Sequence, residues 1–387
     1  MQTIKIESAQ RIQALERALQ QHMALYGYQP MQLPVIEPAE LFLTRASDRI
    51  VNKLFTFERY GRQLALRPEF TAAVARHYVQ EDLKDPVRWQ FSGPIFEDDP
   101  DDHSLEFQAA SVGAESLGEA GIFADAETIA MTAHAIDKQG IANWQLVIGH
   151  VGLQLYLLQR FGLDSRTNRA LLAQRDTLKN PQAGKQAALK NLEHTLAETD
   201  QIRAGLKVNN ISTQEMLNVV LDTTRYGTTM GGRSRRDIAQ RLIDKRERSQ
   251  EYETVLEALD FLDAWVNLSA VPEVAFAQIE TWIGDDTEAK TYFAEWQELL
   301  TLVEAAGVES KRIWIQADLT RNWEYYTGVV FGVRVPDDLY LAGGGRYDSL
   351  ARLLGSASDI PAVGVAFYVN ALLDQLTPEH HHHELIT

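Results

Sequence analysis

Residues 55–71 read FTFERYGRQLALRPEFT, and this stretch does most to decide the fold. Two runs that favour β-strands flank Arg59 to Arg62, where Gly61 supplies the backbone freedom that a tight turn needs. Pro68 follows the second run and suits the first turn of a helix, which we expect to continue to Tyr78. The stretch therefore predicts an antiparallel β-hairpin that leads into a short helix.

The rest of the chain predicts an α+β protein. Ser8 to Tyr26 repeats apolar residues at helical spacing, and further strands and helices follow the hairpin. Strand signals then nearly vanish until about Ala306, after which strands return. An antiparallel core interrupted by a mostly helical insertion explains this order. The predicted parts are a first core segment, the insertion, a second core segment and a tail: residues 1–164, 165–306, 307–375 and 376–387.

The composition limits the partners and the compartment. The 387 residues include 37 Lys+Arg against 54 Asp+Glu, a net charge of −17. Because a tRNA-binding protein neutralises phosphates with a basic surface, we expect no tRNA partner. The chain has no cysteine, which excludes disulfides and Cys-ligated zinc and fits the reducing cytosol. No stretch approaches the ~20 apolar residues that span a bilayer, so the chain is predicted to be cytoplasmic and away from membranes.

Polar residues alternate where the hairpin ends. Arg67, Glu69 and Thr71 would project from the strand end into one cavity. A carboxylate beside a hydroxyl suits an ammonium group, which both can hold by charge-assisted hydrogen bonds. An ordinary capped hairpin is the alternative.

Two later segments also carry residues that could line a ligand cavity. Residues 321–331 read RNWEYYTGVVF and place Arg321 close to Tyr325 and Tyr326, although a loop with surface tyrosines would look the same. Residues 341–350 read LAGGGRYDSL, in which consecutive glycines let backbone approach a ligand or form a tight turn.

In this order the motifs closely resemble histidyl-tRNA synthetase. The resemblance covers about residues 1–150 and 311–375. It implies the fold of a class II aminoacyl-tRNA synthetase, in which an antiparallel sheet is flanked by helices, together with a dimer formed around Pro34.

The resemblance also implies a histidine pocket. In it Glu69 and Thr71 would hold the α-ammonium group, and Arg321 would lie by the carboxylate. Glu115, in VGAESLG, and Tyr326 would recognise the imidazole. Tyr325 would belong to the pocket wall beside Arg321, and Gly344 would form the pocket floor. The spacing before Glu115 departs from the family, so Gln108 and Ser111 are given no role.

The chain differs from the synthetases where they bind ATP. Their second motif carries an arginine at the position of Glu97, and six of the ten residues from Glu97 to Glu106 are acidic. Their third-motif arginine is replaced by Ala371. Because transition-state charge in adenylation needs such cations, we expect no adenylation. The chain also ends at Thr387, so we expect no anticodon-binding domain.

A synthetase-like chain without these features resembles the regulatory subunit of ATP phosphoribosyltransferase. That resemblance implies a short-form catalytic subunit as partner in a hetero-octamer, the first step of histidine biosynthesis as the reaction, and histidine as the feedback effector. It implies no catalytic residue, no cofactor and no metal in this chain.

Other readings stay open. A synthetase-like enzyme could act on a substrate other than tRNA. Residues 218–229, NVVLDTTRYGTT, faintly resemble a phosphoribosyl pyrophosphate loop, so the chain could be a phosphoribosyltransferase itself. A stress sensor would need a further domain. The basic stretch 223–248 could meet an acidic partner or form a solvated helix face, and the run His380 to His383 is interpreted as a disordered tail.

Overall fold

The computed structural model describes residues 6–43, 51–98, 107–180, 182, 184–206, 252–319 and 325–376. The chain divides into two compact units, one formed by Met1–Gln154 with Leu268–Thr387 and the other by Leu155–Asn267. Arg321, most of the acidic loop after Glu97, the basic stretch 223–248 and the histidine run lie outside the described residues.

A nine-stranded sheet forms the centre of the first unit, in the order β1-β5-β6-β12-β11-β10-β7-β9-β8. Neighbouring strands of this sheet are antiparallel, except that β1 is parallel to β5 and β7 is parallel to β9. The strands are β1 (Gln29–Pro30), β5 (Val87–Phe96), β6 (Gln108–Leu117), β7 (Gln145–His150), β8 (Ser269–Ala270), β9 (Ile313–Gln316), β10 (Val329–Val335), β11 (Leu339–Arg346) and β12 (Ala362–Tyr368).

A second, three-stranded sheet contains the hairpin that the sequence predicts. It has the order β2-β4-β3, with strands β2 (Ile36–Pro38), β3 (Thr56–Arg59) and β4 (Arg62–Leu66). Arg59 pairs with Arg62 across the turn, where Tyr60 and Gly61 both have positive φ, 52° and 72°. The predicted helix follows as α4 (Thr71–Gln80), so hairpin and helix are confirmed, but Pro68 lies before the helix and not in its first turn.

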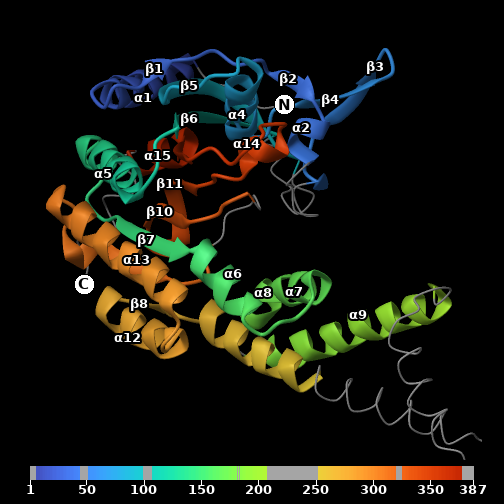
Figure 1. Cartoon of the computed structure of the whole chain (residues 1–387). Helices are drawn as coiled ribbons and strands as arrows, with labels where there is room; N and C mark the ends of the chain where they lie inside the picture. Colours follow the sequence, from blue (N-terminus) through green and yellow to red (C-terminus); the bar gives the residue numbers. More distant parts are fainter. Residues whose placement is uncertain are drawn as a thin grey trace, which may run out of the picture. The chain divides into compact units, whose positions relative to one another are not determined.

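Helices cover the large sheet. In the first unit they are α1 (Ile6–Ala24), α2 (Glu40–Leu43), α4, α5 (Ile122–Lys138), α12 (Pro272–Ile283), α13 (Thr287–Ala305), α14 (Leu350–Leu353) and α15 (Val369–Gln375). Figure 1 shows α5 and α13 side by side, and α5 packs against β10, β11 and β12. None of the helices in the described part of the chain is long and apolar enough to cross a membrane.

The strand register decides which residues share a face of this sheet. Val330 pairs with Gly345, Gly345 with Gly364 and Gly364 with Glu115. Since side chains alternate along a strand, these four positions lie on one face, and Arg346 lies on the opposite face. The face of Glu115 is called the front face below.

The second unit is helical. It contains the end of α6 (Val151–Gln159), then α7 (Ser165–Leu172), α8 (Arg175–Leu178), α9 (Gly184–Leu206) and a helix over 252–266. Asp164 caps α7, because its carboxylate accepts from the amides of Arg166 and Thr167 at 3.0 and 2.8 Å. The core of this unit is a cluster of buried apolar side chains, including Leu158, Leu171, Leu192, Leu259 and Leu262.

The compact units divide the chain differently from the predicted boundaries at 164 and 306. Leu158 joins the helical unit, and α12 and α13 belong to the unit that contains the sheet. The reason is packing: α13 packs against α5, and β8, just before α12, pairs with β9.

Candidate functional site

A cavity of about 440 Å³ opens on the front face of the large sheet. Six of the seven residues that the sequence predicts for the ligand pocket line this cavity. They are Glu69, Thr71, Glu115, Tyr325, Tyr326 and Gly344. The seventh, Arg321, lies outside the described residues. We call this hollow the front cavity.

Glu115 is among the most enclosed polar groups of the front cavity, with 2% of its surface exposed. Its Oε1 accepts from the Thr71 hydroxyl at 2.6 Å, and its Oε2 accepts from the Tyr347 hydroxyl at 2.5 Å. Two hydroxyl donors from distant parts of the chain therefore fix the plane of this carboxylate.

Glu69 closes the start of α4. Its two carboxylate oxygens accept from the backbone amides of Thr71 and Ala72, the latter at 2.9 Å. These amides are among the donors that a helix leaves unpaired at its N-terminus. Glu69 therefore holds the hairpin end and the helix together at the cavity wall.

The two carboxylates lie in a poorly solvated place. Burial raises the pKa of Glu69 to about 7, against hydrogen bonds from the α4 amides that lower it. Burial also raises the pKa of Glu115 to about 8, against hydrogen bonds from Thr71 and Tyr347, and the charge of Glu69 adds to the rise. No Lys or Arg among the described residues pairs with either carboxylate.

Glycines make room for Glu115. A Cβ atom on Gly364 would stand 1.6 Å from Glu115 Oε2, and one on Gly344 would stand 1.8 Å from the carbonyl oxygen of Gly364. Only glycine at these positions lets β11, β12 and the carboxylate come this close. Gly344 lines the front cavity, and its role as the floor of a ligand pocket stays a prediction.

Aromatic rings form another wall. The ring centroids of Tyr325 and Tyr326 lie 4.9 Å apart, and those of Tyr325 and Tyr347 lie 5.6 Å apart. Burial raises the pKa of both Tyr325 and Tyr347 well above the usual range of a phenol, so both hydroxyls keep their protons.

Arg67 does not enter the cavity, contrary to the prediction. Its guanidinium donates to the carbonyls of Leu33, Pro34 and Pro94 at 2.8, 3.2 and 2.9 Å and stacks on the ring of Phe70. Three backbone carbonyls hold this side chain away from the hollow. Its role is to join strand ends.

Sequence reasoning missed two residues that matter here. Tyr347 lies in the quoted glycine-rich motif, and Gly364 lies within PAVGVAF, but neither was assigned a contact. The tyrosine next to the glycines was the available signal. Ser111, which had no assigned role, also lines the cavity.

A second hollow, of about 660 Å³, is lined by residues that include Asp125, His150 and Arg346. Its buried charges pair with one another, since Arg346 bonds Asp125 and Asp348. Burial lowers the pKa of His150 to about 4, and its Nδ1 accepts from the amide of Leu153. The front cavity, with two carboxylates that no described cation neutralises, is the stronger candidate for a ligand site.

A sheet of this order, with helices behind it and a polar cavity in front, defines a class II aminoacyl-tRNA-synthetase-like fold. A solved structure described as an ATP phosphoribosyltransferase regulatory subunit/histidyl-tRNA synthetase from Bacillus halodurans matches 97% of this chain and 82% of its own, with a TM-score of 0.67 and 20% identity. For apo histidyl-tRNA synthetase from S. aureus, the match covers 98% of this chain and 73% of the synthetase chain, with a TM-score of 0.56 and 20% identity. The predicted fold class is confirmed.

The family model for histidyl-tRNA synthetase matches residues 1–225 and 233–372, and the chain belongs to this family. One relative is a histidine–tRNA ligase of Sorangium cellulosum, which is 27% identical over 97% of this chain and 72% of its own length. Another is an ATP phosphoribosyltransferase regulatory subunit of Brucella anthropi, which is 28% identical over 88% of this chain and 92% of its own length.

Proposed function

We propose that this chain is a non-catalytic regulatory subunit of ATP phosphoribosyltransferase and that its front cavity binds histidine as the feedback effector. The observation that carries the proposal is the set of carboxyl groups that line the cavity. Glu69, Glu97 and Glu115 line it, and the described lining residues include no Lys or Arg. Such a cavity suits a ligand with a positive group and is unfavourable for the phosphates of ATP.

The geometry supports histidine in the following way. The oxygens of Glu69 already accept from two helix amides, but a carboxylate offers about four acceptor positions and can also take an ammonium group. Glu115 has its plane fixed by two hydroxyls and can accept from an imidazole N–H. Arg321 is our candidate for the ligand carboxylate.

The ATP side of the cavity supports a loss of catalysis. Glu97 follows β5 at the position where the synthetases carry an arginine, and it lines the front cavity. A phosphate placed near this carboxylate would meet a like charge, which costs about 1 kcal/mol at 4 Å in water and more in a buried site. An enzyme that forms adenylates needs the opposite charge there.

The partners proposed for the chain are a second copy of itself and a short-form catalytic subunit, in a hetero-octamer. The name of the Brucella anthropi relative, of which this chain matches 92%, supports this choice. The match to a histidine–tRNA ligase over 97% of the chain favours a second candidate, an active ligase, which adenylate formation would reveal.

The proposal can be tested by mixing the purified chain with a short-form catalytic subunit and measuring phosphoribosyl-ATP formation with and without histidine. We expect activity only in the mixture, and inhibition by histidine. Glu115→Ala should keep the activation but lose most of the histidine affinity in calorimetry, by roughly ten- to a hundred-fold. Exposed Glu58→Ala, on β3 outside the cavity, serves as the control. No activation in the mixture, or unchanged histidine binding by Glu115→Ala, would contradict the proposal.

A further inference from the structure

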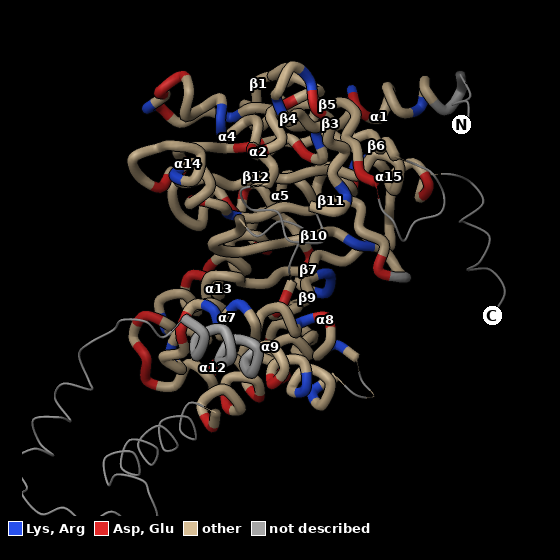
Figure 2. Tube along the Cα trace, turned by 90° about the vertical axis from the view of Figure 1, so that its right-hand side faces the viewer, with Lys and Arg blue, Asp and Glu red and all other residues tan. Residues whose placement is uncertain are grey.

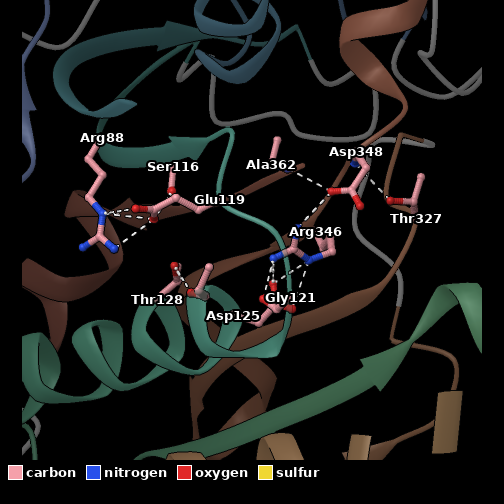
Figure 3. A network of polar contacts seen from close by, with 11 residues as sticks. Arg88, Ser116, Glu119, Gly121, Asp125, Thr128, Thr327, Arg346, Asp348 and Ala362 are labelled. Atoms are coloured by element: carbon pink, nitrogen blue, oxygen red, sulfur yellow. Dashed lines mark hydrogen bonds and ion pairs between the residues drawn. The ribbon is translucent and has the colours of Figure 1, made fainter. Parts of the chain in front are cut away.

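The end of β11 sends consecutive side chains to opposite faces of the large sheet. Tyr347 reaches the front cavity, where its hydroxyl donates to Glu115 Oε2 at 2.5 Å. Arg346 points the other way, toward the start of α5, as Figure 3 shows. Since the two residues are neighbours in the chain, whatever fixes Arg346 behind the sheet also fixes the base of Tyr347 in front of it.

Arg346 is held from several directions. Its Nε donates to both oxygens of Asp125, at 2.9 and 3.0 Å, and Nη2 donates to the Gly121 carbonyl at 3.0 Å. Nη1 donates to Asp348 Oδ1 at 3.1 Å. Arg346 and Asp125 are buried, with 8% and 4% exposed. A buried ion pair adds little net stability, so a role in fixing one conformation is a better explanation of this one.

The backbone on both sides of Tyr347 is fixed as well. The amide of Tyr347 donates to the Ala362 carbonyl at 2.8 Å, and the amide of Thr327 donates to the Arg346 carbonyl at 2.8 Å. Asp348 completes the frame, because its amide donates to Thr327 Oγ1 at 3.0 Å and its Oδ1 accepts from the Ala362 amide at 2.9 Å (Figure 3). Tyr347 cannot move its Cα without breaking several of these bonds.

We propose that Arg346, Asp125 and Asp348 are positioning residues that hold Tyr347 and, through it, the carboxylate of Glu115, and that they thereby set which ligands the front cavity accepts. Thr71 and Tyr347 each occupy one oxygen of Glu115, so the remaining acceptor positions face the hollow in one orientation. A ligand ring with an N–H donor meets an oriented acceptor, whereas a ring of the same shape without the donor leaves it unpaired. The ligand part of this inference rests on the proposed function, and the positioning part does not.

The positioning part can be tested without a ligand. A 3-fluorotyrosine at position 347 places a ¹⁹F label beside the hydroxyl that Glu115 accepts from, and its resonance should move in Glu115→Gln. We expect Asp125→Asn and Asp348→Asn to move it as well. Asp348 is the more exposed of the two, with 35% of its side chain accessible, so its variant tests the same frame if Asp125→Asn does not fold.

Arg88→Gln is the matched control. Arg88 bonds Glu119 by Nε at 3.0 and 3.1 Å, and Glu119 accepts from Ser116, the neighbour of Glu115, at 2.6 Å (Figure 3). This variant also breaks ion pairs, those of Arg88 on β5 with Glu119 and Glu127, but removes no bond to Tyr347, Arg346 or Asp348. Its ¹⁹F resonance should stay at the wild-type position. A resonance that stays in place in both aspartate variants would overturn the proposal.

The ligand part is tested by calorimetry with histidine and with 3-(2-thienyl)-L-alanine, whose ring has a similar size but no N–H donor. Asp125→Asn should weaken histidine binding about ten-fold or more and the thienyl ligand much less, because only histidine uses the oriented acceptor. In the Tyr347→Phe background the same substitution should have no further effect, since the tyrosine carries the coupling.

The outcomes separate the two proposals. If wild type binds no histidine, the proposed function fails, while the ¹⁹F result still decides the positioning role. If histidine binds but Asp125→Asn weakens both ligands equally, or still acts in Tyr347→Phe, the selectivity role is wrong.

Discussion

At the residue scale, Glu115 is a carboxyl group that the folded chain keeps away from water. Burial raises its pKa to about 8, while the two hydroxyl donors stabilise the charged form only in part. The folded protein therefore binds a proton at Glu115 over a pH range in which the unfolded chain, with an ordinary pKa of 4.5, has released it. Where the native state binds more protons, stability falls as pH rises.

The first prediction follows from this linkage. In Glu115→Gln, the part of the fall in stability between about pH 4.5 and 8 that comes from this group should disappear. Relative to wild type, the variant should gain stability steadily across that range and keep the gain above pH 8. Denaturant unfolding midpoints at several pH values measure this.

Glu119→Gln provides a control of opposite sign. Burial opposes ionisation of Glu119, but hydrogen bonds from Arg88 and Ser116 outweigh it and lower the pKa of this carboxyl. Its contribution is present above the unfolded pKa and is lost on acidification, so this variant should lose stability at neutral pH. Equal pH profiles for Glu115→Gln and wild type would show that Glu115 titrates as an ordinary carboxyl.

At the element scale, Arg67 joins the small sheet to the large one. It follows β4, and its guanidinium pairs with no carboxylate in the described part of the chain but donates to carbonyls before β2 and within β5. Gly93 leaves the space for it, since a Cβ there would stand 2.6 Å from Arg67 Nη2. Only 3% of Arg67 is exposed, and loss of the side chain would leave these partly buried carbonyls without this donor.

The second prediction is that Arg67→Met lowers the free energy of unfolding by roughly 2–4 kcal/mol, because three partly buried carbonyls lose the charged donor that they share. Arg59→Met, at an exposed position of β3 in the same hairpin, should cost much less. Urea unfolding of both variants gives the comparison. A cost for Arg67→Met no larger than for Arg59→Met would refute this role.

Local signals in the sequence were enough for the hairpin, because Gly61 sets the turn and the flanking runs pair with their neighbours. They were not enough for Arg67, whose acceptors lie 27 to 34 residues away, before β2 and within β5. The bond between Tyr347 and Glu115 spans 232 residues, so the tyrosine beside the glycines could suggest a contact but not its partner. Likewise, the helical pattern of α13 shows an apolar face but not that α5 covers it.

The small sheet presents an apolar surface. In its register Ile36 pairs with Leu66 and Phe57 with Leu64, so these side chains share one face. Ile36 and Phe57 are 49% and 38% exposed, while Ala65 on the other face is fully buried. Exposed apolar faces of this kind mark interaction sites, and here it supports the proposed dimer of the chain.

The third prediction is that Ile36→Lys weakens self-association, because a charge would have to be buried in the contact. Sedimentation velocity should show a dimer for wild type at micromolar concentration and mostly monomer for the variant. Leu25→Lys, at a 76% exposed position after α1, should remain a dimer. A monomeric wild type, or a dimeric Ile36→Lys, would place the self-contact elsewhere or remove it.

At the scale of the whole molecule, the distribution of charge bears on the proposed loss of ATP binding. The net charge is −17. Figure 2 shows acidic residues spread over the helices and loops, while the central strands carry few charges. In β10, β11 and β12 the charged residues are Arg334 and Arg346, and both are bonded to carboxylates of the chain. Neither is therefore available to hold a phosphate in the front cavity.

The last prediction concerns adenylation. ATP–pyrophosphate exchange with histidine should be undetectable for the isolated chain, because Glu97 lines the front cavity and Ala371, on α15, stands where the synthetases carry an arginine. Glu97→Arg should raise ATP affinity by replacing a repulsive charge with an attractive one. It should not restore exchange, since the second cation is still missing. An active histidyl-tRNA synthetase assayed in parallel is the positive control. Exchange by wild type at a rate comparable to that of the control would show that this chain is a ligase. The front cavity would then be a substrate site.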